Sequence, residues 1–297
     1  MTSGTVQTNG IDIAYESFGP ETGRPLLLVM GLATQMLAWH EGLCQLLVDR
    51  GFHVVRFDNR DVGLSTHLHD APPADVMAAF GGDTSSASYS LEDMADDTVG
   101  LLDGLGLPTA HVVGASMGGM IAQTMAIRHQ TRVRSLTSIM STPSPSIGAP
   151  TPEAVGVLLV APPKNRAEAV QRAIDAYQVI GSPDYPLDVE WLSGIAGMAY
   201  DRSFDPAGVS RQLLAVHASG DRTAALAGVT VPTLVVHGDG DPLVQLAGGE
   251  ATSTAIPGSE LLVIPGMGHN FPRELWPTVV DAITRVADRA DGGLAAS

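Results

Sequence analysis

The segment Val112-Val113-Gly114-Ala115-Ser116-Met117-Gly118-Gly119 decides how this sequence is interpreted. An apolar run typical of a buried strand leads into it, and apolar residues at helical spacing follow it from Met120 to Met125. A tight turn from strand to helix strains its central residue and raises that side chain above the edge of the sheet. Ser116 is therefore a candidate nucleophile. The alternative is a serine that only caps a helix.

A serine hydroxyl is a weak nucleophile until a base takes its proton. Nine histidines are available, and His269 stands out because it ends the glycine-rich loop Pro265-Gly-Met-Gly-His269 after the last apolar run. Glycines allow such a loop to carry an imidazole over the ends of the strands. The pair His67-Leu-His69 could bind a metal adventitiously, but it lacks further ligands. We expect His269 to be the base.

An imidazole base needs a carboxylate that fixes its tautomer and stabilises its charged form. The segment Val235-Val-His-Gly-Asp239-Gly-Asp241 offers two at the end of an apolar run. We favour Asp241, because the longer offset lets the chain turn before the carboxylate faces the histidine loop. Asp239 is the alternative. The aspartate that is not used is expected to accept hydrogen bonds from backbone amides in a turn.

Acyl transfer also needs two N–H donors for the oxyanion. The residue after the nucleophile supplies one, the backbone N–H of Met117. The second is expected from the loop after the first parallel strand, Met30-Gly31-Leu32-Ala33, and we assign it to the N–H of Leu32.

Short apolar runs and helical segments alternate along most of the chain, which predicts βαβ units and a mainly parallel sheet covered on both faces. Asn9-Gly10 predicts a hairpin before the first of these runs. Ser90 and Asp93 predict the start of a helix that continues to about Leu105. The runs lie at Leu26–Met30, His53–Phe57, His111–Val113, Leu136–Met140, Thr233–Val236 and Leu261–Ile264.

The alternation stops between residues 143 and 228. Helices are predicted there over 166–180, 188–199 and 205–217, without a convincing strand. We interpret residues 143–228 as a helical cap, and residues 1–142 and 229–297 as the core that it covers.

With nucleophile, acid and histidine in that order, the sequence resembles an α/β-hydrolase-fold serine hydrolase. The likeness extends to Asp58-Asn-Arg60-Asp61-Val-Gly63-Leu-Ser65, similar to the D-x-R-G-x-G-x-S loop of that family, with Asp61 in place of a glycine. Met30-Gly31 stands where many members have His-Gly. The motifs are also similar to those of actinobacterial carboxylesterase/lipase-like hydrolases, which include anthracycline (aclacinomycin-type) methyl esterases. This resemblance implies an eight-stranded, mostly parallel sheet with a helical cap insertion, and hydrolysis of an ester without cofactor or metal.

Large apolar side chains could line a substrate pocket beneath the cap, although each of them could instead simply belong to the core of the cap. The segment 143–228 has no cluster of arginines, so we expect a neutral ester rather than a multiply anionic one. The pocket residues that we predict are Trp39, Met120, Tyr177, Trp191 and Met267.

The composition excludes several other classes of protein. Sixteen Lys+Arg against 32 Asp+Glu give a formal charge of −16, which disfavours nucleic acid as a partner. The single cysteine, Cys44, excludes an internal disulfide framework. No apolar run approaches the roughly 20 residues that span a bilayer. We expect a soluble, cytoplasmic enzyme that acts on a small-molecule ester, and the sequence leaves its oligomeric state open.

Three other functions fit the same motifs. A cofactor-free haloperoxidase or perhydrolase and a hydrolase of C–C bonds would use the same triad. A ligand-binding protein on a hydrolase scaffold would be expected to have a degraded triad, whereas all three positions are intact here.

Overall fold

The structure is a computed structural model that describes residues 1–295, with side chains described for residues 1–292. Its centre is one eight-stranded sheet in the order β1-β2-β4-β3-β5-β6-β7-β8. β1, β2 and β4 pair in antiparallel fashion, and every other neighbouring pair is parallel. The strands are β1 (Thr2–Thr8), β2 (Ile11–Phe18), β3 (Arg24–Val29), β4 (Phe52–Phe57), β5 (Ala110–Ala115), β6 (Val133–Ile139), β7 (Thr233–Gly238) and β8 (Glu260–Ile264).

This sheet confirms the predicted fold class. Every apolar run named above is a strand or overlaps one. The runs in β3 to β7 are continuous because helices cover both faces of the sheet there, whereas Leu261 and Val263 of the edge strand β8 are exposed. The hairpin turns at Asn9 and Gly10, which both have positive φ, as a two-residue turn of this type requires.

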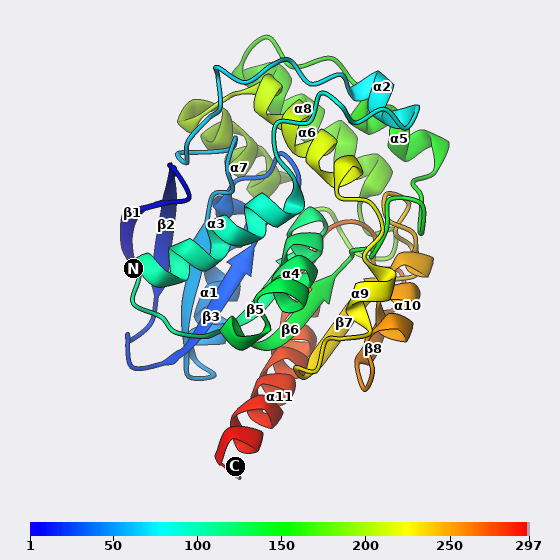
Figure 1. The fold of residues 1–297 in the computed structure, drawn as a ribbon. Coiled ribbons are helices and arrows are strands. Elements are labelled where there is room, and N and C mark those ends of the chain that lie inside the picture. The colour runs from blue at the N-terminus through cyan, green and yellow to red at the C-terminus, as the bar shows by residue number, and fades with distance from the viewer. Residues whose placement is uncertain (296–297) are drawn as a thin grey trace.

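Helices cover the sheet in two layers (Figure 1). α3, α4 and α10 pack on one face, while α1 and α11 pack on the other. Ser90 and Asp93 form the predicted capping box at the start of α3. The helices are α1 (Glu41–Val48), α2 (Val76–Phe80), α3 (Leu91–Gly104), α4 (Met117–Arg128), α5 (Pro152–Leu158), α6 (Arg166–Ile180), α7 (Val189–Arg202), α8 (Pro206–Ala218), α9 (Thr223–Leu226), α10 (Leu246–Ala255) and α11 (Trp276–Ala295), with short 3-10 turns at Met36–Ala38, Gln130–Arg132 and Arg273–Leu275.

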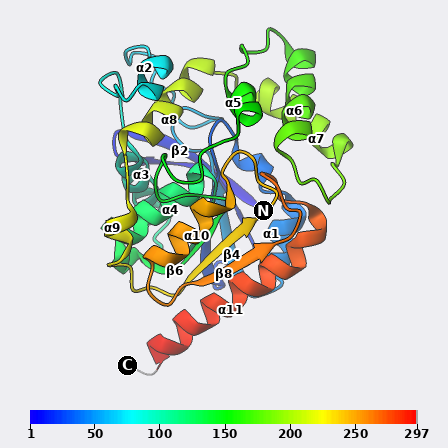
Figure 2. The same cartoon turned by 90° about the vertical axis from the view of Figure 1, so that its right-hand side faces the viewer.

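Residues 143–228, which we call the cap segment, contain α5 to α9 and no strand of the sheet. α5, α6 and α7 lie beyond the end to which the parallel strands point (Figures 1 and 2). α8 is less separate, because Ala215 and Val216 belong to the hydrophobic cluster between the sheet, α3 and α4. The division into two domains at residues 142 and 229 stays a prediction.

No helix within residues 1–295 is long and apolar enough to cross a membrane.

A buried histidine in β5 makes the stability of the fold dependent on pH. His111 is fully buried, and its Nδ1 lies 2.8 Å from the Ser135 hydroxyl. Burial lowers the pKa of His111 to about 4, although the carboxylate of Asp291, 3.5 Å from Nε2, acts in the opposite direction. The unfolded chain, with an ordinary histidine pKa, therefore binds the proton more readily than the folded protein does.

We predict that neutral His111 stabilises the fold above about pH 6.5, and that this contribution is lost as the pH falls towards about 4. Between about pH 7 and pH 4.5 the free energy of unfolding should fall by roughly 2 kcal/mol more in the wild type than in His111→Gln. Urea denaturation at both pH values measures this difference. His69→Gln is the matched control, since that side chain is 74% exposed. Equal losses in the wild type and His111→Gln would refute the assignment.

Candidate active site

Ser116 lies at the turn between β5 and α4, with φ 55° and ψ −122°, a strained conformation for a residue other than glycine. The turn is tight because Gly114 and Gly118, two residues before and two after Ser116, have no side chains. A Cβ on Gly118 would lie 2.1 Å from the Val29 carbonyl oxygen, and one on Gly114 would lie 2.1 Å from that of Gly118. The absence of these atoms allows α4 to start directly against β3 and β5, which raises the Ser116 side chain above the sheet.

The structure brings the three predicted side chains together. His269 follows β8, and its Nε2 lies 2.9 Å from Ser116 Oγ. Its Nδ1 lies 2.8 Å from Oδ2 of Asp241, which follows β7. A carboxylate only accepts, so the Nδ1–H donates to Asp241 and Nε2 is left to accept the serine proton. Asp241 and His269 are both buried, which shields this chain of hydrogen bonds from water.

The second oxygen of Asp241 is held by the backbone. Oδ1 accepts from the N–H groups of Leu243 and Val244, each at 2.9 Å. His237, from β7, lies 3.8 Å from Oδ2, but its Nε2–H donates to the Val244 carbonyl at 2.7 Å. Burial lowers the pKa of His237, so this imidazole remains neutral and adds no charge beside Asp241.

Asp239, the other aspartate after β7, does not hydrogen-bond to His269 and instead accepts a hydrogen bond from a backbone amide. Its Oδ1 accepts from the backbone N–H of Gly266 at 2.7 Å, so it fixes the loop that carries His269. The cap segment holds the same loop, because the N–H of His269 donates to the carbonyl of Ile180, at the end of α6, at 2.7 Å.

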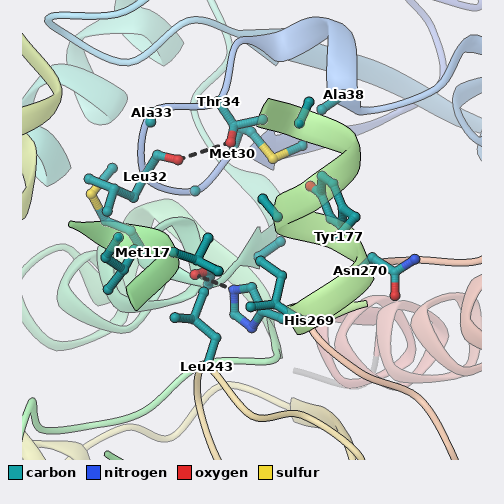
Figure 3. Close-up of a pocket in the computed structure, with 18 of the residues that line it drawn as sticks. Met30, Leu32, Ala33, Thr34, Ala38, Met117, Tyr177, Leu243, His269 and Asn270 are labelled. Carbon is teal, nitrogen blue, oxygen red and sulfur yellow. Dashed lines mark hydrogen bonds between the residues drawn. The ribbon is translucent and has the colours of Figure 1, made fainter. Parts of the chain in front are cut away.

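The two predicted oxyanion donors belong to two backbone segments that adjoin Ser116. Met117 is the first residue of α4, where the helix dipole favours negative charge. Leu32 follows Gly31, whose Cβ position would lie only 3.1 Å from Ser116 Cβ, so this loop passes directly beside the nucleophile. Neither N–H donates to a backbone acceptor in the part of the chain that the structure describes. Figure 3 shows Leu32 and Met117 facing the same space as His269.

That space is a cavity of about 1410 Å³ between the sheet edge and the cap segment. Ser116 and His269 line it together with four of the five predicted pocket residues: Trp39, Met120, Tyr177 and Trp191. The prediction that Met267 lines the pocket is wrong, because this residue does not line the cavity. Its side chain is fully buried in the cluster formed with Ile264 of β8 and Val279 of α11. An apolar side chain two residues before the histidine could have faced either way, and only the packing of α11 decides its direction.

The loop at residues 58–65 supports the site through ion pairs that the sequence did not reveal. Arg60 binds Asp97 of α3 with contacts of 2.6 and 2.7 Å. Asp61 has φ 66°, as expected for a position that the family fills with glycine, and Arg211 of α8 binds both of its oxygens, at 2.8 and 2.7 Å. Asp58 accepts from Arg202 of α7 at 2.5 Å. The partners lie more than 30 residues away in the sequence, so no local pattern could identify them.

One cluster in residues 1–295 has three side chains able to ligate a metal: His67, His69 and Asp205. Its carboxylate is already shared, because Asp205 Oδ2 lies 2.9 Å from His67 Nδ1 and 3.3 Å from Arg211 Nη2. The guanidinium balances the charge that would attract a cation. The cluster is therefore explained as a polar contact between the 58–69 region and α8.

Several known proteins are similar to this chain over almost its whole length. Rhodomycin D methylesterase DnrP of Streptomyces peucetius is 24% identical over 95% of this chain and 97% of its own. A thermophilic esterase from Thermogutta terrifontis is 25% identical, with a TM-score of 0.70 over 98% of this chain and 99% of that one. The enol-lactonase of Burkholderia xenovorans shares the fold, with 22% identity and a TM-score of 0.74 over 95% of this chain and 99% of that one. The model of the alpha/beta hydrolase fold family matches residues 24–174, and the chain belongs to that family.

Proposed function

We propose that the protein hydrolyses a neutral, largely apolar carboxylic ester through an acyl-enzyme intermediate on Ser116. The observation that carries this proposal is the continuous chain of hydrogen bonds from Ser116 through His269 to Asp241 at the floor of the cavity. The names of two relatives, a methylesterase and an esterase, support an ester as the substrate class.

In the first step Ser116 Oγ attacks the ester carbonyl, and His269 Nε2 takes the serine proton. The tetrahedral oxyanion accepts hydrogen bonds from the N–H groups of Leu32 and Met117. His269 then protonates the leaving alcohol as the C–O bond breaks. In the second step His269 takes a proton from water, which attacks the acyl-enzyme, and returns that proton to Ser116 as the acid leaves. Asp241 stabilises the imidazolium in both steps.

The walls of the cavity favour an uncharged ligand. The two arginines that line it, Arg172 and Arg273, are outnumbered by the acids Asp61, Asp188, Asp205 and Glu274. Arg273 binds Asp188 at 3.0 Å. Burial raises the pKa of the Tyr177 phenol, which therefore stays neutral near the end of α6. A dianionic substrate would find no excess of positive charge here. We also propose a cytoplasmic location, which rests on the sequence alone.

We predict that the protein hydrolyses p-nitrophenyl esters of neutral acids, and that Ser116→Ala abolishes this activity. A p-nitrophenyl ester of equal chain length that carries two carboxylates should be a poorer substrate, because the cavity wall offers no unpaired cluster of positive charge to replace the water around them. Release of p-nitrophenolate across a series of acyl lengths gives kcat/KM for each ester.

Clear preference for the dianionic ester would reject the neutral substrate class. Bromination of monochlorodimedone or cleavage of a diketone, without hydrolysis of any ester, would reject the proposed function in favour of the haloperoxidase or the C–C hydrolase.

The two aspartates after β7 provide a matched test of the triad. We predict that Asp241→Asn lowers kcat/KM by about 1,000-fold or more, because His269 loses its charged partner and its fixed tautomer. Asp239→Asn keeps an oxygen that can accept from Gly266, so its kcat/KM should stay within about threefold of the wild type. The reverse order of effects would show that Asp239 is the partner of the base.

A further inference from the structure

The loop that carries the Leu32 N–H is a tight turn with an unusual residue at its third position. The N–H of Thr34 donates to the carbonyl of Gly31 at 3.3 Å, which closes a four-residue turn from Gly31 to Thr34. Ala33, the third residue, has φ 61°. Turns with positive φ at this position normally require glycine or asparagine. Alanine disfavours this conformation, so other contacts must hold the turn in place.

Both ends of the peptide between Leu32 and Ala33 are fixed by side chains. The Thr34 hydroxyl donates to the Leu32 carbonyl at 2.9 Å, as Figure 3 shows. The Ala33 N–H donates to Oε1 of Gln212, a fully buried residue of α8, at 2.9 Å. The more common turn, with negative φ at its third position, differs by a flip of this same peptide. The two side chains therefore select the orientation that alanine disfavours.

Gln212 is itself held in one orientation. Its Nε2 donates to the backbone carbonyl of Arg60 at 2.7 Å, so the amide oxygen must face Ala33. The neighbouring Arg211 fixes α8 by binding both oxygens of Asp61. The side chain that reaches the turn thus projects from a helix anchored to the core.

We propose that Gln212 is a positioning residue for the oxyanion site: by accepting the Ala33 N–H it keeps the turn in its strained form, and so holds in place the adjoining Gly31–Leu32 peptide, whose N–H we assign to the oxyanion site beside Ser116. This inference rests on the proposed ester hydrolysis. Gln212 acts through the turn and does not touch the reacting atoms. A preorganised donor stabilises the transition state because it needs no reorientation as negative charge develops.

We predict that Gln212→Leu lowers kcat/KM for a neutral p-nitrophenyl ester by about 10- to 100-fold, less than complete loss of a donor costs. The Ki of a trifluoromethyl ketone, whose adduct with Ser116 carries the oxyanion, should rise by a similar factor. The Ki of a neutral alcohol with the same carbon chain should not change, because it carries no negatively charged oxygen for these donors. A general loosening of the cap segment would instead raise the Ki of both ligands.

Ala33→Gly provides the decisive control. Glycine adopts φ 61° without strain, so the turn no longer needs Gln212. The double variant Ala33→Gly, Gln212→Leu, compared with Ala33→Gly alone, should therefore recover most of the activity that Gln212→Leu loses. Gln212→Glu should retain more activity than Gln212→Leu, because a carboxyl that burial keeps protonated can accept from Ala33 and donate to the Arg60 carbonyl. This variant covers the case in which the leucine variant fails to fold.

Failure of this inference can be distinguished from failure of the proposed function. A wild-type protein that hydrolyses no ester would reject the function. An active wild type with a folded Gln212→Leu variant of equal activity would reject only the role of Gln212. Loss of activity in Gln212→Leu without rescue by Ala33→Gly would also reject it, since the defect would then lie outside the turn.

Discussion

The close contact of α4 with β3 and β5 is the constraint on which the rest of the site depends. It exists because Gly114 and Gly118 have no side chains where a Cβ would meet a carbonyl oxygen at 2.1 Å. This contact places Ser116 in strained backbone geometry, aims the start of α4 at the space above it, and leaves the Met117 N–H free of a backbone acceptor among the described residues. The nucleophile and one oxyanion donor are thus consequences of a single packing requirement.

The cap segment has a second role besides covering the cavity. At the end of α6, Ile180 accepts from the N–H of His269. At the other side of the site, Gln212 of α8 accepts from Ala33, and Arg202 of α7 donates to Gln35 and Asp58. The base and the second oxyanion donor are therefore both supported by helices that also form walls of the cavity. Any ligand that displaces these helices would alter the geometry of the reacting groups.

Several of these supports are buried ion pairs, of which Asp61 with Arg211 is the most enclosed. Burying two charges costs desolvation energy that their attraction only partly offsets, so such a pair contributes little net stability. The pair instead favours one packing arrangement of the loop and α8, because any arrangement that separates the partners leaves a buried charge uncompensated. Asp61 replaces the glycine expected at this position of the family loop, and its buried carboxylate accepts from Arg211, the Tyr89 hydroxyl and the Leu68 N–H. This pairing links the loop at residues 58–65 to α8 in one defined register.

The sequence alone determined the features that depend on local chemistry: the alternation of strands and helices, the serine between two glycines, the histidine in a glycine-rich loop, and the aspartate after a strand. Four of the five predicted pocket residues line the cavity: Tyr177 and Trp191 come from the cap segment, and Trp39 and Met120 come from the core. Only the tertiary structure decided that Met267 packs against α11, that Asp239 binds Gly266, and that Gln212 reaches the turn at Ala33. These depend on contacts between residues far apart in the chain. Local sequence patterns report periodicity and turn chemistry, and they carry no information about which distant side chain fills a given space.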